Sequence, residues 1–290
     1  MQVPTRREFL VIATEASLAL SCSRLQAFIG NLGAKFKIGV TDWNLQQEGK
    51  LEAVALAKSL GFDGVQVSIG KGTESLPLAN PAVQKAYLDE SKRVDLPVES
   101  LCLEVLHRNF LKSDPLGARW VADSVGIAKA MNVRVVLLPF FGKGALTNTG
   151  EMDKVGDILK EIAPSAEKAG VILGLEDTIS ARENVRIMDR TKSPAVLTYY
   201  DVGNSTNNGF NVVEEIRWLG RDRICEVHLK DNPHYLGEGK IDFKAVIDVL
   251  ADIGFDHWAQ LETDSPVSVD RDMHKNLAFI RGLMAARNAA

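Results

Sequence analysis

The sequence predicts an α/β protein built as a single (β/α)8 barrel. From about residue 36, eight short β-branched runs alternate with longer helical patterns, which is typical of strand–helix units around a parallel sheet. The length of 290 residues also suits such barrels, which commonly need about 250 residues. An open doubly wound sheet is the alternative, but no Gly-x-Gly-x-x-Gly sequence follows the first predicted strand.

The predicted strands lie at regular intervals along the chain. They span residues 37–41, 64–68, 98–104, 133–138, 171–176, 195–201, 223–229 and 258–262. Helical patterns fill the intervals, and a last helix is expected over about residues 270–286. Several helices are followed by a Gly or Asn of the kind that ends helices, namely Gly61, Asn132, Gly170 and Gly254. Since no linker or second core interrupts residues 36–290, we expect one domain.

Composition excludes several classes of function. Hydrophobic residues make up 46% and charged residues 25% of the chain, which is ordinary for a globular protein. The net charge of −4 gives no basic patch for nucleic acid. The cysteines Cys22, Cys102 and Cys225 fit neither a zinc ribbon nor a disulfide framework. Cys102 and Cys225 lie in apolar strand-like runs and are expected to be buried packing residues.

The N-terminal segment, residues 1–27, is similar to a twin-arginine export signal. Arg6 and Arg7 lie in the sequence TRREFL, and a weakly apolar stretch follows. That stretch is too short and interrupted to span a membrane, which needs about 20 apolar residues. We therefore expect export, to the periplasm or an equivalent compartment, without a membrane span. An amphipathic helix packed on the barrel, in a cytoplasmic protein, is the alternative.

Four predicted strands in the second half end near a residue that can bind a metal. These residues are Glu176, Asp201, His228 and Glu262, at separations of 25, 27 and 34 positions. Each separation is about one strand-plus-helix unit. The four side chains should therefore converge on one mouth of the barrel, where barrel enzymes have their active sites.

Three carboxylates and one imidazole form a hard, anionic ligand set. Such a set favours one divalent ion, and we expect Mn²⁺ first, with Mg²⁺ or Co²⁺ as alternatives. Zn²⁺ is less favoured because no thiolate takes part.

The sequences around these residues carry a resemblance. GLEDT, YYDVGN, VHLKD, GEGKIDF and QLET resemble the sugar phosphate isomerase/epimerase family, which has a xylose-isomerase-like TIM barrel, and in particular its ketose 3-epimerases. The similarity covers roughly residues 36–285. The resemblance implies that Glu176 and Glu262 are both metal ligands and the catalytic acid/base pair.

The expected chemistry is proton transfer next to a carbonyl group. Removing that proton leaves an enediolate, whose negative charge a divalent cation stabilises. One carboxylate removes the proton and a second returns it. Return to the same carbon from the opposite face is epimerisation, whereas return to the adjacent carbon is aldose–ketose isomerisation. The metal would hold both glutamates ionised near neutral pH.

Candidate substrate contacts in the first half of the chain are less specific. Trp43 could form an apolar wall against a sugar ring or be a core or rim residue. Gln66 and Glu104 are expected to end strands two and three and to face the same mouth. His107 could donate to a substrate hydroxyl or be a loop histidine.

Three more candidates lie after strands six and seven. Asn204 falls where some ketose epimerases of the family have a substrate-contacting histidine, and His234 falls near a substrate-contacting arginine of those enzymes. Both departures leave the identity of the sugar open. Lys230 could bind a substrate oxygen or pair with a neighbouring carboxylate.

We expect a non-phosphorylated sugar as substrate. Phosphate sites of barrel enzymes are frequent after strands seven and eight, but here Glu238 would repel a dianion. A lyase or dehydratase acting on a 3-keto-glycoside or keto-inositol is the alternative, because it begins with the same enolisation. A non-catalytic sugar-binding barrel is a further alternative, and an apurinic-site endonuclease is disfavoured by the net charge and few histidines. A homo-oligomer is possible.

Overall fold

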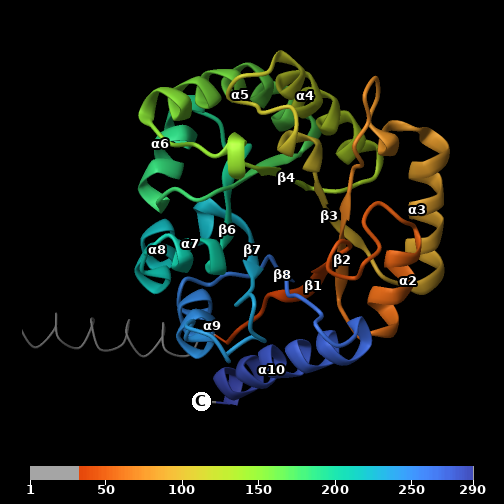
Figure 1. Cartoon of the computed structure of the whole chain (residues 1–290), viewed down its shortest axis with the longest axis vertical. Helices are drawn as coiled ribbons and strands as arrows, with labels where there is room; N and C mark the ends of the chain where they lie inside the picture. The colour runs from red at the N-terminus through yellow and green to blue at the C-terminus, as the bar shows by residue number, and fades with distance from the viewer. Residues whose placement is uncertain (1–32, 290) are drawn as a thin grey trace, which may run out of the picture.

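The eight predicted strand segments form one closed ring. The structure is a computed structural model that describes residues 33–289, and it shows parallel strands in the order β1 to β8 with helices outside the ring (Figure 1). The first strand closes the ring by pairing with the last, as Val40 does with Leu261. The predicted (β/α)8 barrel is therefore confirmed. The predicted export segment and Cys22 lie outside the described residues.

The strands are short and almost entirely buried. Their bounds are β1 Lys37–Thr41, β2 Gly64–Ser68, β3 Val98–Cys102, β4 Val135–Pro139, β5 Ile172–Glu176, β6 Val196–Asp201, β7 Ile224–Leu229 and β8 Trp258–Leu261.

Helices follow each strand and cover the outside of the ring. Their bounds are α2 Glu52–Ser59, α3 Pro81–Val94, α4 Pro115–Ala130, α5 Thr149–Ala169, α6 Ala181–Thr191, α7 Val202–Asn207, α8 Val212–Leu219, α9 Phe243–Asp252 and α10 Val269–Ala289. Short 3₁₀ helices at Pro77–Ala79, Glu104–His107, Gly142–Gly144 and Arg221–Arg223 lie in the connections.

The helix ends follow the sequence signals. Gly61, Asn132, Gly170 and Gly254 all have positive φ, at 86°, 54°, 71° and 70°. In this left-handed conformation the chain leaves the helix and turns toward the next strand. The four predicted helix ends are confirmed.

Two strand boundaries differ from the prediction by two residues, and five others differ by one. The third strand ends at Cys102, because Leu103 leaves the extended conformation (ψ 60°) and Glu104 begins a 3₁₀ helix. The fourth begins at Val135, since the backbone N–H of Val133 still donates to Ala128 of the preceding helix. The second strand spans Gly64–Ser68 as predicted, so Gln66 lies in its middle and not at its end.

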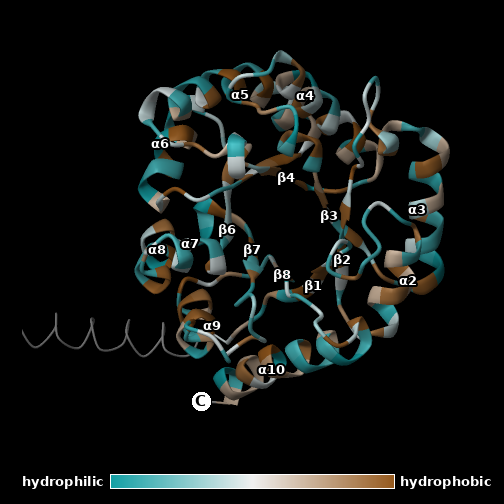
Figure 2. Cartoon of the chain, viewed as in Figure 1, coloured by the Kyte–Doolittle hydropathy of each residue, from teal (hydrophilic) through white to brown (hydrophobic). Residues whose placement is uncertain are grey.

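The main hydrophobic core lies between the ring and the helices. Figure 2 shows apolar residues along β3 and β4 and both apolar and polar residues on the helices, as amphipathic helices on an apolar sheet require. A smaller apolar cluster inside the ring contains Cys102, Leu137 and Cys225. Both cysteines are buried and free, as predicted.

Polar side chains also fill the inside of the ring. Gln66, Ser100, Glu226 and Gln260 are almost fully buried there, although barrel interiors are dominated by branched apolar residues. Within residues 33–289, no helix combines the length and the apolar character that crossing a membrane requires.

Replacing Gly39 with Ala should destabilise the barrel. A Cβ at this position would lie 2.0 Å from Oε1 and 2.9 Å from Cδ of Gln260, a fully buried side chain. We expect the free energy of unfolding to fall by about 1–3 kcal/mol, measured by urea denaturation. Gly126→Ala is the matched control, because a Cβ there meets no atom within 4 Å. It lies inside a helix, so it should stabilise the protein by up to about 1 kcal/mol. Equal stability of both variants would contradict the packing argument.

Candidate metal centre and active site

The C-terminal ends of four consecutive strands bring together the four predicted metal ligands. Glu176 ends β5, Asp201 ends β6, His228 lies near the end of β7, and Glu262 follows β8. One ligand atom from each residue lies within 4.8 Å of the corresponding atoms of the other three. The convergence predicted from strand spacing is therefore present in the structure.

The imidazole of His228 is the centre of this cluster. Its Nδ1 atom lies 2.8 Å from Glu176 Oε1, 3.3 Å from Glu262 Oε2 and 3.7 Å from Asp201 Oδ2. The opposite ring nitrogen, Nε2, lies 3.0 Å from Oε1 of Gln66. The ring thus presents one nitrogen to all three carboxylates and the other to the barrel interior.

Lys230 supplies a positive charge to the same carboxylates. Its ammonium group lies 2.8 Å from Asp201 Oδ2 and 2.6 Å from Glu262 Oε2. Three carboxylates nevertheless outnumber this one lysine, and the imbalance is an electrostatic reason for the cluster to bind a divalent cation. The oxygen-rich donor set and its Nδ1 atom fit a hard cation such as Mn²⁺ or Mg²⁺.

The pKa values follow from burial and these charges. Burial alone would lower the pKa of His228, but Glu176 and Glu262 raise it well above its usual range. Burial raises the pKa of Glu176 to about 7, although the charge of His228 acts against this shift. Burial also acts to raise the pKa of Glu262, but the charges of His228 and Lys230 outweigh it and hold that pKa well below its usual range.

Asp201 also fixes the chain that follows it. Its Oδ1 accepts the backbone N–H of Asn204 at 2.7 Å and so caps α7, while its Oδ2 faces the cluster. The Asn204 side-chain amide lies 3.5 Å from Glu176 Oε1. One carboxylate therefore links the helix start to the cluster.

A pocket of about 450 Å³ opens beside the cluster. It is lined by Trp43, Glu48, Ser68, Lys71, Cys102, Glu104, His107, Pro139, Phe141, Glu176, Asn204, Lys230 and Glu262. Its volume is in the range of small-molecule sites.

Five of the seven predicted substrate contacts line this pocket: Trp43, Glu104, His107, Asn204 and Lys230. The indole N–H of Trp43 donates to Glu262 Oε1 at 3.2 Å. The ring of His107 stacks on Phe141 at a centroid distance of 6.1 Å. Burial, and then the charge of Lys71, lower the pKa of His107, which keeps the imidazole neutral at neutral pH.

Glu104 has one oxygen in use and one free. Its Oε1 accepts the backbone N–H of Gly70 at 2.7 Å. Its Oε2 is buried and has no hydrogen-bond partner among residues 33–289. Burial raises the pKa of this carboxyl to about 7. A buried oxygen of this kind at a pocket wall is a candidate hydrogen-bond acceptor for a ligand.

The other two predicted contacts lie elsewhere. Gln66 is fully buried beneath the pocket and contacts His228. His234 is exposed and lines a separate pocket of about 200 Å³ together with Asp231. The loop turns away there because Asp231 accepts the backbone N–H groups of Gly239 and Lys240.

Comparison with known proteins identifies the family. Residues 54–283 match the family model described as xylose isomerase-like TIM barrel. The chain belongs to the xylose isomerase-like TIM barrel family.

Proteins similar to this chain are named as sugar epimerases. The chain is 26% identical over 203 residues to the 2-epi-5-epi-valiolone 7-phosphate 2-epimerase of Actinoplanes sp., covering 68% of this chain and 73% of the relative. It is 25% identical over 249 residues to the L-ribulose-5-phosphate 3-epimerase UlaE of Escherichia coli, covering 76% and 86%. The structure of an L-ribulose 3-epimerase has the same fold, with a TM-score of 0.73, 17% identity, and coverage of 88% and 96%. The predicted resemblance and enzyme class, a metal-dependent epimerase or isomerase, are confirmed.

Sequence reasoning missed part of the pocket wall of this family member. Glu48, Lys71 and Phe141 come from loops without periodicity, whereas Ser68 was identifiable as the last residue of its strand. Asp42 was also missed, although its hydrogen bonds connect two segments of the pocket wall. Its carboxylate accepts the backbone N–H groups of Gly49 and Ser68 and the Ser68 hydroxyl at 2.8–2.9 Å.

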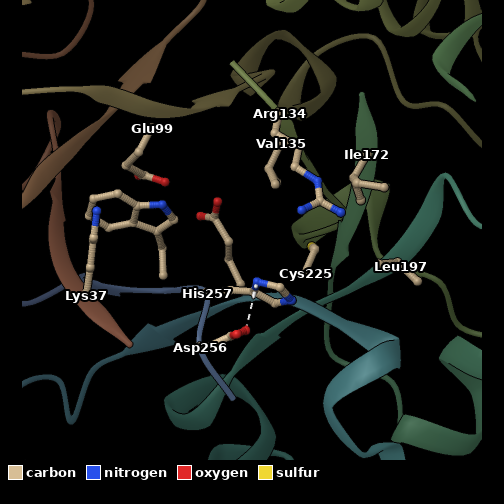
Figure 3. Close-up of a pocket in the computed structure, with 11 residues that line it drawn as sticks. Lys37, Glu99, Arg134, Val135, Ile172, Leu197, Cys225, Asp256 and His257 are labelled. Atoms are coloured by element: carbon tan, nitrogen blue, oxygen red, sulfur yellow. Dashed lines mark ion pairs between the residues drawn. The ribbon is translucent and has the colours of Figure 1, made fainter. Parts of the chain in front are cut away.

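The barrel has a second pocket, of about 220 Å³, at its opposite end. It is lined by Lys37, Glu99, Arg134, Val135, Ile172, Leu197, Cys225, Glu226, Asp256, His257 and Trp258 (Figure 3). Lys37 and Trp258 begin their strands, so this pocket lies at the N-terminal mouth. It is therefore distinct from the pocket beside the metal cluster.

We predict that the protein binds one divalent cation at the cluster. Adding Mn²⁺ to EDTA-treated protein should raise the melting temperature, because a ligand that binds only the folded state stabilises it. Saturating Mn²⁺ at about 100 times its Kd should contribute about 2.7 kcal/mol. Asp201→Asn should weaken binding, whereas Asp231→Asn, outside the cluster, should not. A stoichiometry other than one ion per chain in isothermal titration calorimetry would contradict this prediction.

Proposed function

We propose that this protein is a sugar epimerase or isomerase that acts on a non-phosphorylated sugar with one divalent ion, preferentially Mn²⁺. The observation that carries the proposal is the meeting of Glu176 and Glu262 at His228 Nδ1, at 2.8 and 3.3 Å, beside a pocket. The two glutamates come from strands separated by two others. They therefore reach the pocket from different directions, as the removal and return of a proton on opposite faces requires.

The residues of this chain have distinct roles in the proposed reaction. A bound divalent ion would supply positive charge that stabilises the enediolate. One of Glu176 and Glu262 removes the proton next to the carbonyl, and the other returns a proton. Trp43 holds Glu262 through its indole N–H, while the neutral His107 contacts a substrate hydroxyl. The apolar faces of Trp43 and Phe141 exclude water from the sugar ring.

The charges of the pocket favour a sugar without phosphate. Both relatives are named for phosphorylated substrates, so the choice depends on the residues present here. The two lysines that line the pocket are already paired, Lys71 with Glu48 and Lys230 with Asp201 and Glu262. No arginine lines this pocket in the described part of the chain. Glu104 adds a carboxyl group, so a phosphate dianion would find no free cation.

Hydrogen exchange tests the proposed reaction. Metal-loaded protein in D₂O, offered a panel of free ketoses, aldoses and 3-keto-glucosides, should incorporate deuterium at one carbon of its substrate, as measured by NMR. EDTA-treated protein should give none. Glu176→Gln and Glu262→Gln should each reduce the product-forming rate at least about a hundredfold, while circular dichroism should show that both variants remain folded. Loss of the leaving group in the product spectrum would identify a lyase instead, and full activity of either variant would remove that residue from the acid/base pair.

Substitution of Glu104 tests the substrate class. In Glu104→Gln the amide oxygen should keep the contact with Gly70 N–H, so an NH₂ donor replaces the buried acceptor. KM for the free sugar should rise roughly tenfold, because losing a hydrogen bond so that a buried polar group is left unpaired costs about 1–3 kcal/mol. Glu48→Gln, at an exposed ion pair on the same pocket, should change KM by no more than about fivefold. A lower KM for the sugar phosphate in the unchanged protein would contradict the proposed substrate class.

A further inference from the structure

A chain of hydrogen bonds runs from the metal cluster into the barrel interior. His228 Nε2 lies 3.0 Å from Gln66 Oε1. The Gln66 amide nitrogen donates to the Tyr199 hydroxyl at 3.2 Å, and that hydroxyl donates to Glu226 Oε2 at 2.9 Å. All four side chains are at most 1% exposed, so water does not compete with these bonds.

The donors and acceptors of this hydrogen-bond chain can be assigned. Because the Tyr199 hydroxyl has one hydrogen and donates it to Glu226, it can only accept from Gln66. The Gln66 amide must then present its oxygen to His228, and Nε2 must carry the hydrogen. In the neutral form of the ring, which metal binding requires, the lone pair would then be on Nδ1, the atom that faces Glu176, Asp201 and Glu262.

Packing holds the tyrosine in this position. Its ring lies edge-on to His228 at a centroid distance of 4.6 Å. Gly174 on β5 makes room for it, since a Cβ there would lie 3.2 Å from Tyr199 Cβ and 2.8 Å from Cys225 Sγ. At the far end, Glu226 lines the pocket at the N-terminal mouth. The hydrogen-bond chain therefore spans the barrel interior from one mouth to the other.

We propose that Gln66 is a positioning residue that sets the tautomer of His228 so that Nδ1 binds the metal ion, with Tyr199 and Glu226 fixing the Gln66 amide. This role replaces the substrate contact expected from the sequence, and it extends the proposed function to the control of metal affinity. Partners of this kind fix both the tautomer and the ring orientation of a metal-binding histidine, and their loss typically weakens metal binding about 10–100-fold.

The barrel contains a matched control. Gln260 is equally buried and donates to the same Glu226 oxygen, at 3.3 Å, but has no hydrogen bond to His228. Its own Oε1 has no hydrogen-bond partner among residues 33–289. Gln260→Leu therefore changes the polarity and packing of the interior without touching the histidine.

The test measures metal affinity without any substrate. EDTA-treated protein is titrated with Mn²⁺ near neutral pH, and free Mn²⁺ is measured by electron paramagnetic resonance. Gln66→Leu should raise Kd about 10–100-fold, and Tyr199→Phe should raise it by a smaller factor because the amide is freed to rotate. Gln66→Glu should keep Kd within about threefold of that of the unchanged protein, since the glutamate carboxylate can still accept a hydrogen bond from Nε2–H of His228. Gln260→Leu should also stay within about threefold.

A second readout follows the tautomer directly. In ¹⁵N spectra of the metal-free protein, recorded at a pH at which His228 is neutral, the ring should carry its hydrogen on Nε2, and Gln66→Leu should give a mixture of tautomers. Unchanged affinity in Gln66→Leu, or an equal loss in Gln260→Leu, would overturn the positioning role. In both cases the unchanged protein still binds Mn²⁺, so the proposed function survives. If the unchanged protein bound no Mn²⁺, the positioning role and the metal-dependent function would both be refuted.

Discussion

Repulsion among two buried carboxylates and a third, partly buried one is the constraint around which this active site is arranged. Glu176, Asp201 and Glu262 all lie close to a single imidazole nitrogen, at a depth where charges interact strongly. Such a group is unstable without compensation. Lys230 offsets part of the charge, and a bound divalent cation would offset the rest. Folding thus brings together negative charges that metal binding would neutralise.

The closed ring of strands holds these carboxylates close together despite their repulsion. Hydrogen bonds between neighbouring strands, from β1 round to β8 and back, fix each ligand at a strand end and prevent the carboxylates from moving apart. Beneath them, polar side chains replace the usual apolar interior. Gln66 and Tyr199 pack less favourably than leucine or valine would, but they can orient a histidine, which an aliphatic layer cannot do. The barrel interior thus orients His228 more accurately but buries less apolar surface.

The sequence predicts the parts that depend on chain spacing. Glu176, Asp201 and His228 were found because strand ends recur at regular intervals, and Asn132 or Gly170 marks where a helix must stop. The role of Gln66 was not predictable, because it depends on how the strands align across the ring, and the pairing of β2 with β3 shifts between Val65 and Gln66. His234 was misplaced because the bonds that turn its loop away come from backbone groups that side-chain patterns do not reveal.

The four candidate metal ligands all come from the second half of the barrel, whereas other residues of the pocket wall, Trp43, Lys71, Glu104 and Phe141, follow the first four strands. In the proposed function, proton transfer is assigned to the second half of the chain, and most of the remaining pocket wall comes from loops of the first half. Substitutions in those first-half loops should therefore alter which sugar is accepted while leaving the proposed proton-transfer residues in place.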